Sequence, residues 1–170
     1  MNLLIRLLLV LVSRFFRKPL KVLEESCLHF WVLPNDLDIY GHMNNGRFLT
    51  IMDLGRIDLI LRSKLGKVAS EHKWNPLVAQ SHMLFKRPLQ LFEGYVLRTR
   101  ILGWDHKWFF IEQDFEYRGK VIARGYVKGL FRGKQGNITP EKVLRLADEN
   151  HDSPELSQKI LSLFSHEDKA

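Results

Sequence analysis

Residues 36–56 read DLDIYGHMNNGRFLTIMDLGR and join a loop of titratable and amide side chains to the start of a helical pattern. Asn44 or Asn45 can serve as the helix N-cap, because its side chain can accept a hydrogen bond from a backbone N–H of the first turn. Apolar or small residues then recur at helical spacing as far as the charged residues near position 62; these are Phe48, Ile51, Met52, Gly55 and Leu59. We therefore expect a long helix that packs closely on a sheet where Gly55 lies in its buried stripe.

Runs with strand character lie on both sides of this helix. Residues 26–33 are apolar and aromatic, and Pro34-Asn35-Asp36 ends the run. The stretch 66–76 is polar and predicted to be irregular, and the β-rich runs that follow it are residues 77–85, 95–104, 108–117 and 121–131. The last three runs should form an antiparallel meander, because Asp105-His106 and Arg118-Gly119 are short enough for hairpin turns.

The order of strand, long helix and four strands predicts an α+β domain over residues 22–135, in which one curved antiparallel sheet wraps the helix. A homodimer that continues the sheet across its edges would satisfy the unpaired edge of such a sheet. Residues 136–170 are expected to form a C-terminal helical extension. Its two helices should begin at Thr139-Pro140-Glu141 and Ser153-Pro154-Glu155, where proline can occupy the first turn.

Residues 1–21 form a basic and apolar N-terminal segment. The net charge of the chain is +7, and removing the five cations that precede the first acid, Glu24, leaves +2 for residues 22–170. A positive balance confined to one tail suits an anionic membrane surface. Nucleic-acid binding would need a basic face or stacking motif within the folded part, which we do not find, so no nucleic-acid partner is expected.

Residues 3–16 are almost wholly apolar and predict an N-terminal helix. A helix of that length spans about 21 Å, short of the roughly 30 Å hydrocarbon core of a bilayer. One side of the helix would carry Asn2, Arg6, Ser13 and Arg17, which is typical of a helix lying in the membrane plane. The alternatives are a signal peptide, which lacks a small-x-small cleavage site here, and a helix that packs its apolar side on its own domain or on a dimer partner.

Cys27 is the single cysteine and lies in an apolar run, which predicts a buried structural thiol. One cysteine supports no internal disulfide, and this favours a cytoplasmic location, with residues 1–18 in peripheral contact with a membrane. Four histidines outside the loop motif have no neighbour at metal-ligand spacing, so we expect no metal and no other cofactor. They are His29, His72, His82 and His106.

The loop before the long helix holds the residue types that could perform chemistry. Asp38 and His42 could serve as base or nucleophile with an orienting partner, and unpaired N–H groups at a helix N-terminus can hold a developing oxyanion. A loop acid before a helix is, however, more often a cap or turn former. Residue types alone therefore leave a structural role and a catalytic role open.

The order and spacing of these residues resemble a known family. Asp-Leu-Asp-x-x-x-His-x-Asn-Asn, followed by Gly-Arg-Phe and by Asp53-x-x-Arg56, is similar to the hotdog-fold thioesterases over about residues 26–132. The likeness is to bacterial 4-hydroxybenzoyl-CoA thioesterase-like proteins and plant acyl-ACP thioesterases, and the layout with an apolar leader is similar to thioesterase superfamily member 6-like proteins. The resemblance implies a single hotdog domain that hydrolyses an acyl-CoA or acyl-ACP thioester to free acid and thiol.

The resemblance also implies roles for individual residues. In the bacterial group, the acid matching Asp38 attacks the thioester or activates water, and the backbone N–H matching Asn45 polarises the carbonyl. In the plant enzymes the matching acid works with residues at the positions of Tyr40 and His42. The plant enzymes have asparagine at the position of Tyr40, and their downstream glutamate has no assignable match in this chain. The implied catalytic residues are Asp38, His42, Asn45 and Asp53, and the implied substrate contacts are Tyr40, Asn44 and Arg56.

The departures from the family pattern keep an alternative open, namely a non-catalytic membrane-associated protein that binds acyl groups. Asp53 and Arg56 lie three apart on the helix and can pair, and the family's acid at this position often reaches the site from one subunit. Candidates for contact with the carrier's phosphates are Lys86, Arg87, Arg98 and Arg100. The aromatic side chains Trp104, Trp108, Phe109 and Phe110 more often fill a core or dimer interface than line an acyl tunnel.

Overall fold

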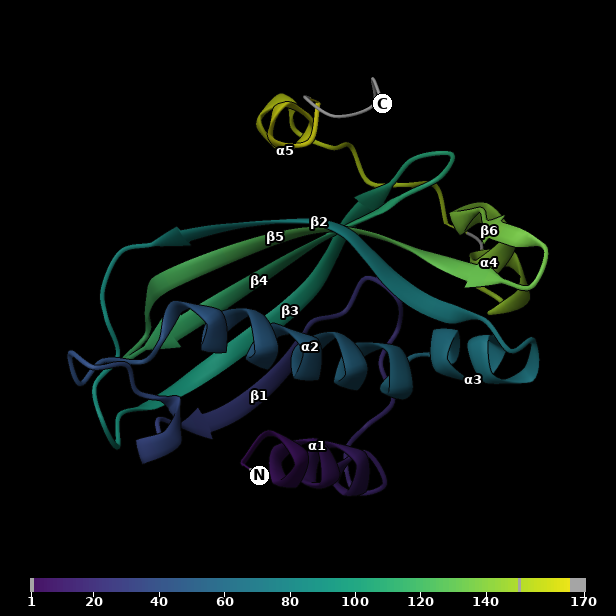
Figure 1. Ribbon diagram of the computed structural model, residues 1–170. Coiled ribbons are helices and arrows are strands. Elements are labelled where there is room, and N and C mark those ends of the chain that lie inside the picture. Colours follow the sequence, from purple (N-terminus) through teal and green to yellow (C-terminus); the bar gives the residue numbers. More distant parts are fainter. Residues whose placement is uncertain (1, 150, 166–170) are drawn as a thin grey trace.

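The strands of this chain form one antiparallel sheet that curls around a long helix, α2 (Asn45–Arg62), in the computed structural model, which describes residues 2–149 and 151–165 (Figure 1). The strand order is β1-β3-β4-β5-β2, with β6 paired to β5. Their bounds are β1 (Ser26–Trp31), β2 (Asn75–Phe85), β3 (Gly94–Trp104), β4 (Phe109–Tyr117), β5 (Lys120–Gly133) and β6 (Gly136–Ile138). The expected α+β architecture and the β3-β4-β5 meander are both confirmed.

Helix α2 has the cap and the buried stripe that its sequence predicts. The Asn44 side chain accepts a hydrogen bond from the Gly46 N–H at 2.8 Å. The five predicted stripe residues are buried, and they face the inner side of the sheet. A Cβ atom at Gly55 would lie 2.3 Å from Oγ1 of Thr99 on β3 and 2.9 Å from Nε2 of Gln113 on β4. Only glycine therefore permits this approach of helix to sheet.

Two expectations about helices are wrong. The stretch 66–76 is not irregular, because α3 (Lys64–Glu71) continues almost directly from α2 and β2 begins at Asn75. Leu65, Val68 and Ala69 of α3 are buried at helical spacing. The helix α4 (Pro140–Leu146) begins at Thr139 as predicted, but α5 (Gln158–Leu163) is capped by Ser157 and not by Ser153.

Ser153 is used elsewhere, which explains why no helix begins there. Its Oγ accepts a hydrogen bond of 2.8 Å from the N–H of Trp104 at the end of β3. Trp104 packs with α3 and α4 and Phe110 packs with α5, as expected of residues that fill a core, whereas Phe109 belongs to the α3–α4 cluster and also lines an apolar cavity. Cys27 is half-buried and contacts Glu25 and Arg98, so the expectation of a fully buried thiol is wrong.

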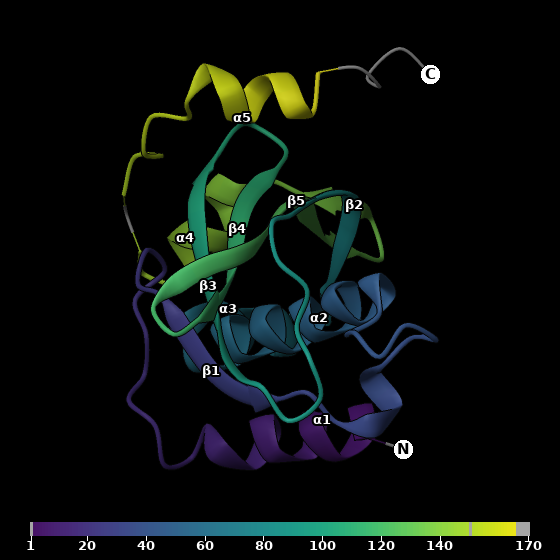
Figure 2. The same ribbon diagram turned by 90° about the vertical axis from the view of Figure 1, so that its left-hand side faces the viewer.

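The predicted N-terminal helix is present as α1 (Asn2–Ser13) and packs on α2, with Val10 in the same apolar cluster as the α2 stripe. Both views place it on the outside of β1 and α2 (Figures 1 and 2). No helix in residues 2–149 or 151–165 is long and apolar enough to cross a membrane. The orientation of α1 differs from that of an ordinary surface helix, as described below.

Candidate active site

The loop that joins β1 to α2 folds back on itself and places Asp38 beside the start of the helix. After a single 3-10 turn, η1 (Pro34–Asp36), Leu37 forms an antiparallel bridge with Met43. The Asp38 N–H donates to the His42 carbonyl at 2.8 Å, and the Asn44 N–H donates to the Asp36 carbonyl at 2.8 Å. The two acids of the Asp-Leu-Asp sequence therefore lie along residues 42–44, next to the first turn of α2.

Asp36, the first of these acids, is buried and has a structural role. Its carboxylate accepts hydrogen bonds from the Arg6 guanidinium, the shortest at 2.6 Å, and from the Leu33 N–H at 2.9 Å. Arg47 Nε lies 3.5 Å from its Oδ1. These contacts engage both oxygens, so Asp36 is not available to a substrate.

Asp38 is half-buried, and only one of its oxygens is engaged. Oδ1 accepts hydrogen bonds from the Tyr40 N–H at 2.9 Å and from the His42 N–H at 3.2 Å, while Oδ2 accepts none from the described residues. Two backbone donors fix the position of this carboxyl group. The second oxygen is left for a water molecule or a substrate.

His42 holds Asp38 through its backbone rather than through its ring. The ring is half-buried, and its nitrogens make no hydrogen bond within the part of the chain that the structure describes. The ring is therefore not the group that orients Asp38 here. Tyr40 is 78% exposed, and Asn44 and Asn45 are exposed as well, so these residues present polar groups at the surface of the loop.

The first turn of α2 leaves one backbone donor unused. The Gly46 N–H is capped by the Asn44 side chain, and the Arg47 N–H donates to the Asn44 carbonyl at 2.8 Å. The Asn45 N–H has no acceptor among the described residues. Because N–H groups at a helix N-terminus carry a partial positive charge, the Asn45 N–H can stabilise an oxyanion.

Asp53 and Arg56 lie elsewhere, at an apolar cavity of 420 Å³ between α2 and the sheet. They form the expected ion pair, and Arg56 also donates to Oε1 of Gln113 at 2.6 Å. Burial lowers the pKa of Arg56, and the charge of Asp53 opposes that shift. The cavity wall is otherwise almost wholly apolar and includes Leu3 and Leu7 of α1, with further residues from α2, β2, β4 and β5.

The structure thus brings the predicted site residues together in two groups rather than one. The loop group holds Asp38, Tyr40, His42, Asn44 and Asn45, none of which lines the cavity. Asp53 lies eight residues beyond Asn45, which corresponds to about 12 Å along the helix axis. Gln113 is hydrogen-bonded to Arg56 of the cavity group, and the sequence did not predict this role. The sequence feature that could have indicated it is a polar residue at an inward-facing position of a strand.

The basic residues proposed as phosphate contacts are mostly paired with acids of the same chain. Arg87 contacts Glu93, Arg100 contacts Glu112, and Arg98 contacts both Glu25 and Glu116, each with a shortest distance of 2.6 to 2.8 Å. Among the four candidates, Lys86 alone has no ion pair with a described residue. A phosphate would have to compete with these carboxylates, which makes the three arginines poor candidates.

Comparisons with known proteins agree with this architecture. Residues 32–162 match the model of the Thioesterase-like superfamily. Protein THEM6 of Danio rerio is 33% identical over 149 residues, which cover 85% of this chain and 72% of that protein.

Two solved structures are similar as well. The probable thioesterase YbaW of Escherichia coli superposes with a TM-score of 0.67 at 21% identity, covering 72% of this chain and 96% of that one. The gentisyl-coenzyme A thioesterase BH1999 superposes with a TM-score of 0.62 at 23% identity, and the alignment covers 71% of this chain and 99% of that one. At these identities the likeness establishes the fold, and the expected hotdog fold is confirmed.

Proposed function

This chain belongs to the thioesterase-like superfamily and is a thioester hydrolase, and from that premise we propose that it cleaves acyl-CoA with the Asp38 carboxylate as general base or nucleophile. The observation that carries the proposal is the half-engaged carboxylate of Asp38 in the loop that leads into α2, where the Asn45 N–H has no acceptor among the described residues. One group can activate or supply a nucleophile, and the other can hold the oxygen on which negative charge develops.

The proposed reaction is the addition of water to the thioester carbonyl, followed by cleavage of the C–S bond. Asp38 removes a proton from the attacking water; alternatively it attacks the carbonyl itself, the thiolate leaves, and water then hydrolyses the mixed anhydride to release the acid and free Asp38. The Asn45 N–H donates to the oxyanion of the tetrahedral intermediate, assisted by the positive end of α2. The leaving sulfur takes a proton to give the free thiol. We assign His42, Tyr40 and Asn44 to positioning the water and the substrate.

We place the acyl chain in the apolar cavity beside Asp53 and Arg56, which would hold its polar end. A second copy of the chain would bring the two groups of residues into one site. Strand β2 is one edge of the sheet and exposes Leu77, Val78, Leu84 and Phe85, so pairing of two β2 strands would cover apolar surface and extend the sheet. In such a homodimer, Asp53 of one copy would approach the loop of the other.

We further propose that the protein works on the cytoplasmic side of a membrane, in peripheral contact through residues 1–18. Acyl carrier protein is the second candidate for the group that carries the acyl chain. CoA is preferred because the solved structures that resemble this fold include the gentisyl-coenzyme A thioesterase BH1999.

A non-catalytic acyl-binding protein is the competing function, and one observation favours it. Asp38 does not line the cavity, so within one copy the carboxylate and the apolar cavity are separate. In this alternative, the cavity binds an acyl chain and Asp38 is only a turn former.

The test is the release of free thiol from short-, medium- and long-chain acyl-CoA and from acyl-ACP by the full chain. Asp38→Asn should lower kcat by about 10² to 10⁴ while the protein still folds and binds substrate. Asp152→Asn is the matched control, because Asp152 is an exposed acid outside both groups of site residues. Full activity of Asp38→Asn would overturn the assignment of the site, and saturable acyl binding without any thiol release would favour the competing function.

A further inference from the structure

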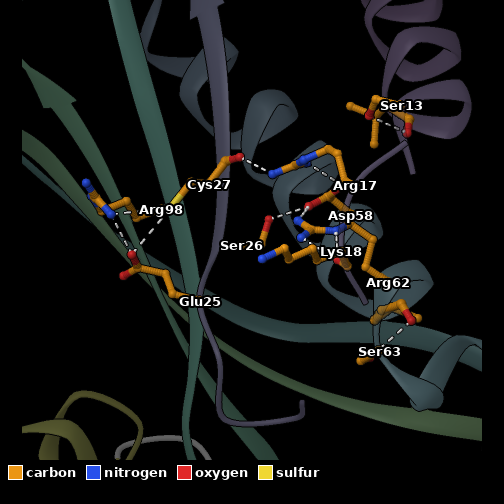
Figure 3. A network of polar contacts seen from close by, with 12 residues as sticks. Ser13, Arg17, Lys18, Glu25, Ser26, Cys27, Asp58, Arg62, Ser63 and Arg98 are labelled. Atoms are coloured by element: carbon orange, nitrogen blue, oxygen red, sulfur yellow. Dashed lines mark hydrogen bonds and ion pairs between the residues drawn. The ribbon is translucent and has the colours of Figure 1, made fainter. Parts of the chain in front are cut away.

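Helix α1 turns toward the protein the side that carries Arg6, together with Leu3, Leu7 and Val10. Arg6 is buried and donates to both oxygens of Asp36 and, at 2.6 Å, to the carbonyl of Trp31. Just beyond the helix, Arg17 donates at 2.9 Å to Asp58, an acid of α2 that is fully buried (Figure 3). Two of the residues predicted to form the outward polar face of an in-plane helix are thus tied to carboxylates inside the domain. The side chain of Asn2 lies outside the described part of the structure.

The apolar side of the same segment faces outward. Seven large apolar side chains between residues 4 and 16 are about half exposed or more, from 48% for Val12 to 86% for Phe16. We call this surface the apolar ridge; it consists of Leu4, Ile5, Leu8, Leu9, Val12, Phe15 and Phe16. A helix on the surface of a water-soluble domain normally has the opposite orientation. A continuous exposed apolar surface of this kind marks a site of interaction.

The charges around the ridge indicate what covers it. Residues 1–21 contain no acid, and Lys18 and Lys21 are exposed while Arg14 is half-buried and lies over the ring of Phe15. Apolar side chains flanked by uncompensated cations match the acyl and headgroup layers of an anionic membrane. We propose that the apolar ridge is a docking surface for an anionic lipid bilayer, held in a fixed orientation by the Arg6–Asp36 and Arg17–Asp58 ion pairs.

A second copy of the chain fits the ridge less well. A two-fold interface brings the same surface of both copies together, so the cations beside one ridge would face those beside the other. Like charges placed opposite each other at an interface oppose association. A bilayer with anionic headgroups has the opposite charge and needs no shape complementarity to a convex helix.

The position of α1 also bears on the substrate, a point that rests on the proposed function. Leu3 and Leu7 lie on another side of the helix from the ridge and line the 420 Å³ cavity together with Ile57 of α2. The helix that would lie in the bilayer is therefore also part of the wall of the acyl cavity. This arrangement suits acyl thioesters whose chains are long enough to partition into the membrane, and it would let such a chain pass from the bilayer to the cavity without crossing water.

Sedimentation with vesicles tests the docking surface. The full chain should sediment with vesicles of phosphatidylcholine containing about one quarter phosphatidylserine, and less with phosphatidylcholine alone. The double substitution Leu8→Ser/Leu9→Ser should lower the partition coefficient by about 100-fold, about tenfold for each leucine. Leu146→Ser/Leu161→Ser is the matched control, because it also replaces two exposed leucines, which are 43% and 45% exposed on α4 and α5. This control should bind vesicles as the parent does.

Several results would overturn the proposal. The first is that the parent chain does not sediment with vesicles, and the second is that the ridge variant binds vesicles as strongly as the parent. The third is that the ridge variant changes from dimer to monomer in light scattering while its vesicle binding persists. Hydrolysis separates this inference from the proposed function. The ridge variant should hydrolyse butyryl-CoA in solution at the parent rate and palmitoyl-CoA in vesicles about tenfold more slowly or worse. A parent chain that binds vesicles but cleaves no thioester would refute the proposed function and leave the docking surface standing.

Discussion

Replacing Arg6 by methionine should destabilise the protein strongly, because it leaves the buried carboxylate of Asp36 without its main partner. The guanidinium makes hydrogen bonds of 2.6 and 3.2 Å to this carboxylate, and the two side chains are 7% and 1% exposed. Removing one partner of a buried ion pair costs about 3 to 5 kcal/mol. Asp36 would keep the Leu33 N–H and the more distant Arg47, so we expect a loss of about 3 kcal/mol in the free energy of unfolding.

Urea unfolding followed by tryptophan fluorescence measures this loss, at one protein concentration because an oligomer gains stability with concentration. The double variant Arg6→Met/Asp36→Asn should recover about 2 kcal/mol, since a neutral amide needs no cation and can still accept from the Leu33 N–H. Arg145→Met, at an exposed position of α4, should change stability by less than about 0.5 kcal/mol. A loss below about 1 kcal/mol for Arg6→Met, or no recovery in the double variant, would refute the assigned role of the pair.

Three further outcomes follow from single positions. Gly55→Ala should cost about 1 to 3 kcal/mol in urea unfolding, since its Cβ would meet Thr99 Oγ1 at 2.3 Å; an unchanged midpoint would show that the helix can move away. Burial raises the pKa of Tyr95 above its ordinary value of 10.0, so as the pH rises the unfolded chain loses this proton before the folded chain does. The free energy of unfolding of the parent should therefore fall above pH 10 more steeply than that of Tyr95→Phe. Parallel curves of stability against pH for the two proteins would contradict the burial of Tyr95. Burial and the neighbouring Glu25 raise the pKa of the Cys27 thiol, so iodoacetamide should react slowly at pH 7.5 and faster with Glu25→Gln, and rapid alkylation of the parent would count against this environment.

Local features of the fold were predictable from the sequence because neighbouring residues determine them. The cap at Asn44 and the buried stripe of α2 depend on spacing within one helix. Helix α3 shows how that approach fails: polar residues dominate residues 66–73, and the short buried triplet of Leu65, Val68 and Ala69 was outweighed by them. Ser153-Pro154-Glu155 has the composition of a helix start, but a tertiary hydrogen bond to Trp104 takes the serine.

The candidate site was predictable only as a set of positions. The resemblance drew attention to Asp38 and Asn45, but the sequence could not indicate that the His42 backbone, rather than its ring, contacts Asp38. The Arg6–Asp36 pair joins residues that are 30 positions apart, and the Arg17–Asp58 pair joins residues that are 41 positions apart. No local sequence pattern connects the members of either pair. The proposed approach of Asp53 to Asp38 would require contacts between two copies, which neither the spacing nor the fold of a single copy determines.

The orientation of α1 follows from the contacts of its inward side. Turning the ridge toward the domain would turn Arg6 away from a buried carboxylate, whose isolation costs about 3 to 5 kcal/mol, and would expose Val10, whose burial is worth about 1.5 to 3 kcal/mol. The ion pairs to Asp36 and Asp58 and the apolar contacts of Val10 thus fix which side of α1 faces the domain, and the ridge stays outside at the cost of its exposure to water. A bilayer removes the remaining cost, since it covers the ridge while both ion pairs stay intact. Because Asp36 also supports the loop that holds Asp38, the same contact that orients the proposed docking surface also positions the proposed catalytic carboxylate of Asp38.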